Sequence, residues 1–457
     1  MAIEHLPASE GLGMTTASES DLDVVLAELT DWLEANWDPE LPLRDWWQRL
    51  GEAGWAQPHW PREWYGRGLS PADGLAVSVA IQRFGAVPAP VGFATGMAGP
   101  TLLVHGTEDQ KRRHLRGMVT GSDGYCQLFS EPNAGSDLAG LQTTAVLDGD
   151  DWVVNGQKVW TSGGQVANRA MLVARTNVDV PKHAGISYFL IRMDQPGIEV
   201  RPLREMTGRR FFNEVFITDA RVPVDDLIGG EGKGWTVAST TLGFERALSG
   251  GRGATTTARP GPIAGDLDVP AGAFVVAPDA DAPSVAARLS GWPRLADLAR
   301  QVGRNSDPGV RQGLVRLYTL ERLLALTGRR ARALHEAGGE LPGLPSLAKM
   351  AQNHAIRLGR DLTFAVLQSA GMLHGYDPHA VATAEAVTGM AGLGEVMEGA
   401  LFAQGPPIYG GSDQIQRSIV GERVLGLPRE PSADRGVPFR DLPIGAAWLA
   451  HTGSRID

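Results

Sequence analysis

The sequence predicts an α+β fold, mostly α, in which helices come first, an antiparallel β domain follows and helices return. Three observations support this order. Apolar residues recur at helical spacing near the start, strand-like runs separated by turn dipeptides fill the middle, and helical spacing reappears over the second half. A chain of 457 residues is long enough for two to three such domains.

The first domain, residues 1–124, is predicted to be α-helical. Its opening helix shows apolar residues three and four positions apart, which places them on one face of a helix: Leu22, Val25, Leu26, Leu29 and Leu33. Helical pattern continues to about residue 113, with interruptions at proline-rich turns such as residues 57–64.

The second domain, residues 125–230, is predicted to be an antiparallel sandwich or barrel. Asp148-Gly149 and Asn155-Gly156 are hairpin-turn dipeptides, and β-branched and aromatic residues flank them. Four further strand-like runs follow, with the sequences AMLVART, ISYFLIRM, GIEVRPL and FNEVFITDARVP.

The third domain, residues 231–430, is predicted to be a helical bundle. Helical periodicity returns after residue 233 and is strong over residues 312–334 and 346–373. Residues 251–292 are rich in Gly, Ala, Pro and Thr and show little period, which indicates an inserted mobile loop. Residues 431–457 are predicted to be a polar, irregular tail.

Composition excludes several classes of function. The formal net charge of −10 argues against nucleic acid as a partner. Cys126 is the single cysteine, so the chain can form neither an internal disulfide nor a cysteine-based metal site, and its histidines lack ligand spacing. We therefore expect no metal. No apolar run is long enough to span a bilayer, and the N-terminus lacks the apolar core of a signal peptide, so we expect a cytoplasmic protein.

The run QLFSEPNAGSDLAG, residues 127–140, predicts a loop that lies against a polar ligand. Gly135 gives the backbone freedom, and Ser130 and Ser136 each offer a donor and an acceptor. No Gly-Lys-Ser/Thr follows, so the loop is not a P-loop, and no G-x-G-x-x-G opens a helix. The alternative is an ordinary turn whose Ser and Asp side chains cap their own backbone.

Three blocks of the sequence resemble the acyl-CoA dehydrogenases. They are SEPNAGSD (residues 130–137), NGQKVWTSGG (residues 155–164) and GGSDQIQRSIVGERVLGLPR (residues 410–429), and they occur in the family's order around a β domain. The resemblance extends over about residues 21–428. It implies an N-terminal helical domain, a central antiparallel β-barrel, a C-terminal four-helix bundle, and FAD bound between the domains.

The resemblance also implies a set of flavin-binding residues. The loop backbone and Ser130 face the pyrimidine end of the flavin, Trp160 covers one face, and Ser162 approaches N5. Donors at these places stabilise negative charge on the reduced ring. Ser136 also lies near the pantetheine arm of the CoA thioester. The full set is Gln127, Leu128, Phe129, Ser130, Gly135, Ser136, Trp160, Thr161, Ser162, Gly411, Ser412, Asp413 and Gln414.

The catalytic base is expected at Glu245. Many family members carry the base in a Tyr-Glu-Gly-Thr sequence, but here that sequence is Tyr409-Gly410-Gly411-Ser412, and Gly410 cannot act. Others place the glutamate in a Glu-Arg pair on an earlier helix, which Glu245 and Arg246 match. Arg246 resembles the arginine that binds CoA. The alternative for Glu245 is a solvated helix carboxylate.

Two motifs that complete a neighbouring subunit's FAD site in homotetrameric members are changed. Asp307-Pro308 stands where Phe-Gly is expected, and QSAGMLHGYD, from Gln368, departs from the glycine-rich motif, although Arg304 is retained. This pattern resembles the catalytic α-type subunits of actinobacterial heteromeric acyl-CoA dehydrogenases. It implies a β-type partner that supplies the missing contacts in an α2β2 heterotetramer.

The function that these resemblances imply is FAD-dependent dehydrogenation of an acyl-CoA to the trans-2-enoyl-CoA, with electrons passed to an electron-transferring flavoprotein. Two alternatives stay open: a non-catalytic subunit that binds acyl-CoA and FAD, and an acyl-CoA oxidase on the same fold. The sequence does not reveal whether the acyl chain is fatty, branched or a steroid side chain.

Overall fold

The structure is a computed structural model that describes residues 19–248, 256–276, 291–339, 341–429, 431 and 434–443. Residues 251–255 and 277–290 of the predicted inserted loop, and most of the predicted tail, therefore lie outside the described residues. The chain divides into two compact units. One comprises Met1–Leu203, Phe212–Asp279 and Asp434–Asp457, and the other comprises Arg204–Phe211 and Ala280–Ala433.

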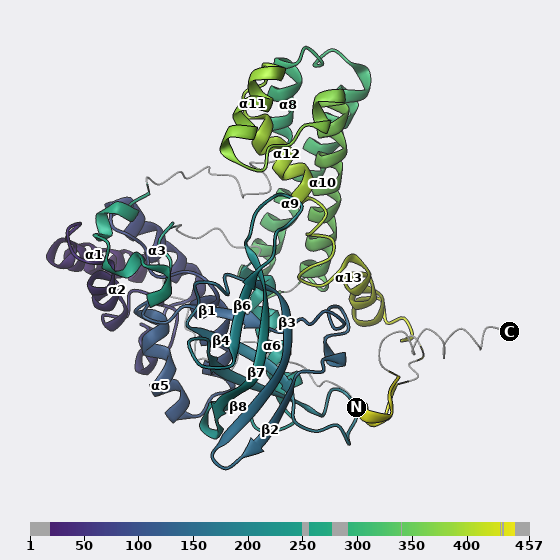
Figure 1. The fold of residues 1–457 in the computed structure, drawn as a ribbon. Helices are drawn as coiled ribbons and strands as arrows, with labels where there is room; N and C mark the ends of the chain where they lie inside the picture. Colours follow the sequence, from purple (N-terminus) through teal and green to yellow (C-terminus); the bar gives the residue numbers. More distant parts are fainter. Residues whose placement is uncertain are drawn as a thin grey trace. The chain divides into compact units, whose positions relative to one another are not determined.

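Helices form the first part of the first unit, as the sequence predicts (Figure 1). The start of each of two helices is fixed by a capping side chain: Ser70 accepts a hydrogen bond from the amide of Asp73, and Thr107 forms a capping box with Gln110. The helical elements are α1 (Glu19–Asn36), α2 (Leu43–Glu52), η1 (Arg62–Trp64), α3 (Pro71–Phe84), η2 (Ala94–Ala98), α4 (Gly99–His105), α5 (Glu108–Val119) and, after the sheet, α6 (Gly234–Leu248).

The strands form one eight-stranded sheet in the order β6-β7-β3-β2-β4-β5-β8, with β1 beside β4. The sheet is antiparallel as predicted, except that β4 pairs in parallel with β1 and with the first residue of β2, Thr144. β1 enters from the helical part of the chain instead of from a hairpin, so no turn dictates its direction. The strands are β1 (Tyr125–Leu128), β2 (Thr144–Asp148), β3 (Asp151–Ser162), β4 (Arg169–Arg175), β5 (Ile186–Arg192), β6 (Ile198–Pro202), β7 (Phe212–Pro223) and β8 (Leu227–Ile228).

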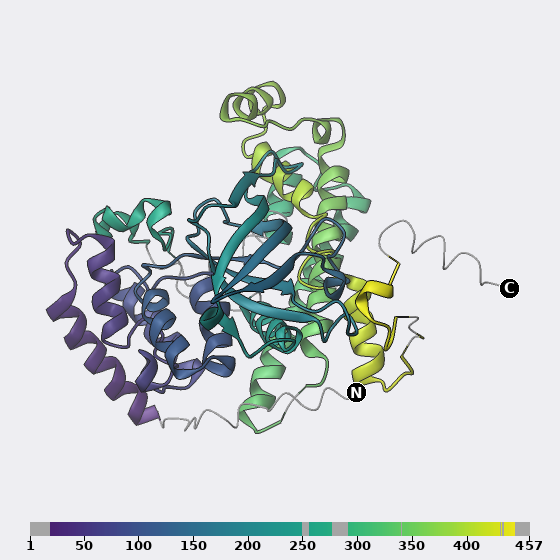
Figure 2. The same ribbon diagram turned by 60° about the horizontal axis from the view of Figure 1, so that its bottom comes forward.

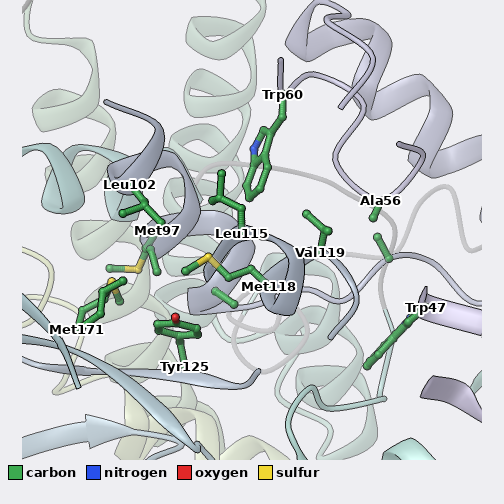
Figure 3. Packing of buried hydrophobic residues seen from close by; sticks show 14 of the residues in the cluster. Trp47, Ala56, Trp60, Met97, Leu102, Leu115, Met118, Val119, Tyr125 and Met171 are labelled. Atoms are coloured by element: carbon green, nitrogen blue, oxygen red, sulfur yellow. The ribbon is translucent and has the colours of Figure 1, made fainter. Parts of the chain in front are cut away.

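Two apolar cores lie on opposite faces of this sheet. Side chains of a strand alternate between faces, and in β4 the residues Met171 and Val173 join the core of the N-terminal helices, whereas Leu172 joins the core on the other face. Figure 3 shows Met171 and Tyr125 of the sheet close to Met97 and Leu102 of the helices. The sheet and the N-terminal helices therefore share one core.

The second unit is helical and contains the two longest helices, α9 and α10, which pack against each other (Figure 2). Its core consists of apolar residues from α8, α9, α10 and α12. Helix α6, with which the predicted third domain would begin, belongs to the first unit. The elements are α8 (Trp292–Gln301), α9 (Pro308–Glu336), α10 (Leu344–Leu367), η8 (Gln368–Met372), α11 (Pro378–Thr388), α12 (Leu393–Phe402), α13 (Asp413–Ile419) and η9 (Val420–Val424).

Residues 256–276, in the predicted mobile loop, are irregular but packed. They form three short turns, η5 (Pro262–Ala264), η6 (Asp266–Asp268) and η7 (Ala271–Phe274). The amide of Leu43 donates to the carbonyl of Val269 at 2.9 Å, and the amide of Ala271 donates to that of Leu41 at 2.8 Å. Ala271 is fully buried. This part of the predicted loop is therefore irregular but packed against the N-terminal helices, and its mobility stays a prediction.

Residues 434–443 of the predicted polar tail are also held in place. They contain η10 (Phe439–Asp441), and Phe439 is buried in the first unit. No helix in the described ranges is long and apolar enough to cross a membrane.

Candidate active site

The loop after β1 lies against the end of β3, so the structure brings together two groups of predicted flavin residues, 127–130 and 160–162. The amide of Val159 donates to the carbonyl of Ser130 at 2.9 Å. The loop tip is closed by reciprocal backbone bonds between Glu131 and Ala134, at 3.0 and 3.1 Å. Gly135 and Ser136 follow this turn, and both are exposed.

A buried ion pair that the sequence reasoning missed fixes this loop. Lys158 is fully buried, and its Nζ donates to Oε1 of Glu131 at 2.8 Å and to the carbonyls of Phe129 and Val173 at 3.1 and 2.9 Å. Both residues could have been noticed, since Glu131 lies in the block SEPNAGSD and Lys158 in the block NGQKVWTSGG. Only the three-dimensional pairing shows that they act on each other.

Glu131 also accepts two backbone amides, from Gln142 at 2.7 Å and from Thr143 at 3.0 Å. Burial alone would raise the pKa of this carboxyl, but the ammonium of Lys158 and these donors outweigh burial, and the pKa lies below its usual value. The carboxylate is thus ionised and ties both ends of the loop, residues 131 and 142, to the sheet.

Trp160 stands in an unusual backbone conformation beside this loop. Its φ is 61°, in the left-handed region that side chains disfavour, at an irregularity in the pairing of β3 with β7. The indole is 60% exposed and packs only its edge against Phe212, with ring centroids 5.8 Å apart. A large apolar ring that is held outward at a cost in backbone strain is typical of a ligand-binding surface.

Thr161 supplies a buried hydroxyl next to the tryptophan. Its side chain is 1% exposed, and its Oγ1 has no hydrogen-bond partner among the described residues, although its carbonyl accepts from Nδ2 of Asn213 at 2.9 Å. The half-buried Ser130 and Ser162 flank the same place. An open aromatic face beside unpartnered polar atoms fits a flat ring with polar edges, which is the chemistry of a flavin.

The predicted base lies on α6, which is joined to the same part of the sheet by hydroxyl contacts. Oγ1 of Thr241 donates to the phenol oxygen of Tyr188 on β5 at 3.2 Å, and the ring of Tyr188 packs edge-on against Phe129 at 5.9 Å. Glu245 is four residues after Thr241 and so occupies the same face of the helix. Glu245 is half-buried, and the adjacent Arg246 is exposed.

The remaining predicted flavin residues, 411–414, belong to the second unit, where several have local partners. Ser412 caps α13 by accepting from the amide of Ile415. Asp413 is buried and accepts from Nδ2 of Asn353 at 2.6 Å and from Arg357 at 2.7 Å. Burial would raise the pKa of Asp413, but these two donors hold it below its usual value. Gln414 is exposed, and Gly411 adopts a φ of 82°.

Gly410, which replaces the glutamate of other family members, lies beside a cation. A Cβ at this position would stand 3.4 Å from Nζ of Lys349, and the backbone φ is 61°. The same ammonium lies 4.9 Å from the ring centroid of Tyr409, whose pKa is raised to about 12 by burial. A carboxylate here would pair with an ammonium, which favours the ionised form and weakens the carboxylate as a base.

The altered motif at residues 304–308 begins a helix. Oδ1 of Asp307 accepts from the amides of Gly309 and Val310, at 2.8 and 3.1 Å, and Pro308 is the first residue of α9. Oδ2 of Asp307 accepts from Arg304 at 2.5 Å. The amide of Val310 and the guanidinium of Arg304 both lower the pKa of Asp307. Arg304 therefore already has an anionic partner within its own chain.

The order of elements, a helical part, a sheet that carries a polar loop, and a helical bundle, defines the class of acyl-CoA dehydrogenase folds. Two family descriptions match the chain: the N-terminal domain of acyl-CoA dehydrogenases over residues 23–122, and their middle domain over residues 126–220. The acyl-CoA dehydrogenase IpdE1 of Mycobacterium tuberculosis is 38% identical over 390 residues, covering 85% of this chain and 88% of that protein. The chain belongs to the acyl-CoA dehydrogenase family, whose activity is the dehydrogenation of acyl-CoA thioesters.

Other relatives support the same assignment. The acyl-CoA dehydrogenase FadE34 of Mycobacterium tuberculosis is 35% identical over 83% of this chain and 46% of its own length. Among solved structures, the Tcur3481-Tcur3483 steroid ACAD matches with a TM-score of 0.63 at 25% identity, over 91% of this chain and 99% of that chain. The ChsE4-ChsE5 complex from Mycobacterium tuberculosis matches with a TM-score of 0.60 at 26% identity, over 91% and 100%.

Proposed function

We propose that this chain is the catalytic subunit of an FAD-dependent acyl-CoA dehydrogenase, in which the carboxylate of Glu245 removes the α-proton of the thioester. When bound, FAD accepts the β-hydride, and the product is the trans-2-enoyl-CoA. The residues proposed to hold the flavin in the first unit are the loop from Gln127 to Ser136 and the run from Trp160 to Ser162.

The observation that carries this proposal is the position of Glu245. It is half-buried, and it shares a helix face with Thr241, which the phenol of Tyr188 on β5 joins to Phe129 of the loop after β1. Glu245 is the single carboxylate on α6, and a carboxylate is a common general base. Arg246 follows and is exposed, and its guanidinium matches the arginine that binds CoA in the family.

The geometry at Gly410 supports the same assignment. Glycine has no side chain that can accept a proton. The neighbouring ammonium of Lys349 would lower the basicity of a glutamate placed there. We therefore expect that Gly410→Glu does not restore turnover to a Glu245→Gln variant. Recovery of turnover in the double variant would contradict the role of Glu245 as the only working base position.

The deciding experiment replaces Glu245 by Gln in the holoenzyme. Glutamine keeps the size and the hydrogen bonding of the side chain but cannot take a proton, so turnover is expected to fall by about 10²–10⁴-fold while FAD content is unchanged. Glu108→Gln is the matched control, since Glu108 is an exposed glutamate on α5 that pairs with Lys111. Near-normal turnover in Glu245→Gln would refute the assignment.

We further propose that the chain works with a β-type partner as an α2β2 heterotetramer and passes electrons to an electron-transferring flavoprotein. Support comes from the changed motif at Asp307-Pro308 and from two structural relatives that are named as pairs of polypeptides, Tcur3481-Tcur3483 and ChsE4-ChsE5. The first of these relatives is named as a steroid enzyme, which favours a bulky acyl group for this chain. A panel of fatty, branched and steroid acyl-CoA thioesters, assayed with the co-purified partner, tests the substrate. Rapid reaction of the reduced enzyme with oxygen would indicate an oxidase instead.

A further inference from the structure

The C-terminal segment of residues 434–443 docks on the connection between β4 and β5. The amide of Phe439 donates to the carbonyl of Val180 at 2.9 Å, and the amide of Arg440 donates to that of Val178 at 3.0 Å. Pro438 bridges to Pro181. We call residues 434–443 the C-terminal strap. Two cations join this strap to the loop that follows β1. They are Arg175, at the end of β4, and Lys182, in the connection between β4 and β5.

The first of these cations is Arg175, at the end of β4. Its side chain is 2% exposed, and its guanidinium donates to the carbonyl of Ala139 at 2.7 Å and to that of Leu141 at 3.1 Å. The ring of Phe439 lies over the same guanidinium, 3.3 Å from Cζ to the centroid. One face of the cation thus meets an aromatic ring while its edge holds the loop, an arrangement that favours a desolvated arginine.

The second cation is Lys182, in the connection between β4 and β5. Its Nζ contacts Oδ1 of Asp137 at 2.9 Å and Oδ2 of Asp434 at 2.5 Å. The two aspartates raise the pKa of Lys182, although burial opposes them, so the ammonium is charged at neutral pH. Asp137 is the residue directly after Ser136, and Asp434 is the first residue of the strap. One ammonium therefore links the two segments.

The loop is consequently held in two halves. Lys158 and Glu131 hold residues 129–131 and the amides of residues 142 and 143 independently of the strap. Residues 137–141 are held by Arg175 and Lys182, and both of these cations also contact the strap. Ser136 lies at the junction of the two halves, so its position depends on the second set of contacts.

We propose that the C-terminal strap positions the segment that carries Ser136 and thereby sets the affinity of the enzyme for its acyl-CoA thioester. Phe439 and Asp434 act as positioning residues through Arg175 and Lys182. This inference rests on the proposed function for the role of Ser136 toward the thioester. The contact between strap and loop does not depend on that role, and it is tested by a measurement that needs no substrate.

The first test is amide hydrogen exchange of the full-length protein with Phe439→Ala, Phe439→Tyr and wild type. Loss of the ring removes the aromatic cover of Arg175, so amides of residues 137–141 should exchange at least about 10-fold faster, while amides in the centre of β5 keep their protection. Phe439→Tyr keeps an aromatic ring over the guanidinium and should restore slow exchange. Arg440→Gln is the control on the strap, because Arg440 pairs only at the surface with Asp179.

The second test is steady-state kinetics of the same variants with the best thioester of the substrate panel. A misplaced Ser136 weakens binding in the ground state and the transition state alike, so KM should rise about 10-fold with kcat within about 2-fold in Phe439→Ala. Asp434→Asn should change KM in the same direction. Phe439→Tyr and Arg440→Gln should resemble wild type.

Two results would overturn the proposal. Unchanged exchange of residues 137–141 in Phe439→Ala would show that the strap does not hold the loop. Exchange that rises equally in the loop and in β5 would show that Phe439 serves general stability alone. If wild type turns over no acyl-CoA thioester, the proposed function fails, and the exchange data still decide whether the strap holds the loop.

Discussion

The geometry of Trp160 supports its predicted place at a ligand-binding surface. Its ring is exposed and its backbone is left-handed, two features that a residue selected for stability alone would avoid. The sequence predicted the role of this tryptophan through its block, but not its conformation. A positive φ at a non-glycine position depends on the pairing irregularity between β3 and β7, which sequence spacing does not encode.

We predict that Trp160→Gly separates stability from flavin binding. Glycine relieves a left-handed conformation that costs about 1–2 kcal/mol, and its extra entropy in the unfolded chain offsets part of this gain, so the stability of the apoprotein should change by less than about 1 kcal/mol. Loss of the stacking surface should weaken FAD binding by roughly 10-fold or more. Thermal unfolding of the apoprotein and flavin titration measure the two effects.

Trp152→Ala is the matched control for this variant. Trp152 is 6% exposed and packs against Phe189 in the core of the sheet, so its truncation should cost about 3–5 kcal/mol of stability. Comparable destabilisation by Trp160→Gly would show that Trp160 is a structural residue instead.

The ion pair of Glu131 and Lys158 makes the stability of the fold decrease at acidic pH. The folded pKa of Glu131 lies below its value of 4.5 in the unfolded chain, so the pair stabilises the fold fully above about pH 4.5, and this contribution is lost as the pH falls through the folded pKa. Glu131→Gln leaves the ammonium of Lys158 buried without its counter-ion and should cost about 3–5 kcal/mol at pH 7.

The difference in unfolding free energy between wild type and Glu131→Gln should therefore shrink as the pH is lowered below about 4.5. Chemical denaturation over pH 3–7 measures this difference. Glu199→Gln is the control, because Glu199 pairs with Arg201 at the surface and its loss should have little effect. A difference that is constant with pH would contradict the ionised pair.

At the scale of elements, local signals predicted the strands and helices well. The Asp148-Gly149 turn joins β2 to β3 as the dipeptide indicates, with a φ of 62° at Gly149. The turn predicted at Asn155-Gly156 is wrong, because these residues lie inside β3 at an irregularity in its pairing with β7. What the sequence could not predict are contacts between distant segments. Residues 256–276 and 434–443 have no period of their own, and they are ordered by surfaces that other parts of the chain provide.

We predict that residues 256–276 contribute to the stability of the first unit. Ala271 is fully buried and bonded through its amide to Leu41, so Ala271→Arg places an unpaired charge and excess volume in a packed interior. The variant should lose more than about 3 kcal/mol of stability or fail to accumulate as soluble protein. Ile263→Arg, at a side chain that is 49% exposed in the same segment, is the control and should behave as wild type.

At the scale of the molecule, the site predicted from sequence is divided between the two units. Residues 127–136, 160–162, Glu245 and Arg246 belong to the first unit, whereas residues 411–414 belong to the second. In the first unit, the loop of residues 127–136 lies beside residues 160–162. In the second unit, Ser412 and Asp413 have partners within that unit. Family resemblance could name these residues, but the contacts of Lys158, Arg175 and Phe439 became visible only with the fold.

The last prediction concerns how many flavins the chain binds by itself. In homotetrameric relatives a neighbouring copy supplies contacts to FAD at the place where this chain has Asp307-Pro308. Here Asp307 caps α9, and its carboxylate also accepts a hydrogen bond from the guanidinium of Arg304, the one cation that the motif retains. A second copy of this chain would therefore present a carboxylate and an engaged arginine to an anionic pyrophosphate, which binds best to free cations and amide donors. We expect well below one FAD per polypeptide when the chain is expressed alone, and one FAD per heterodimer when a β-type subunit is present.

Flavin absorbance per polypeptide, together with the mass of the complex in solution, measures both quantities. The variant Asp307→Phe/Pro308→Gly restores the motif and releases Arg304, so it should raise the flavin content of the lone chain, although loss of the helix cap should cost about 1 kcal/mol of stability. Asp297→Asn is the control, because Asp297 is an exposed carboxylate on α8 that pairs with Arg300. A stable homotetramer of the unmodified chain with one FAD on every polypeptide would refute the prediction, since it would show that Asp307 does not prevent a like subunit from completing the site.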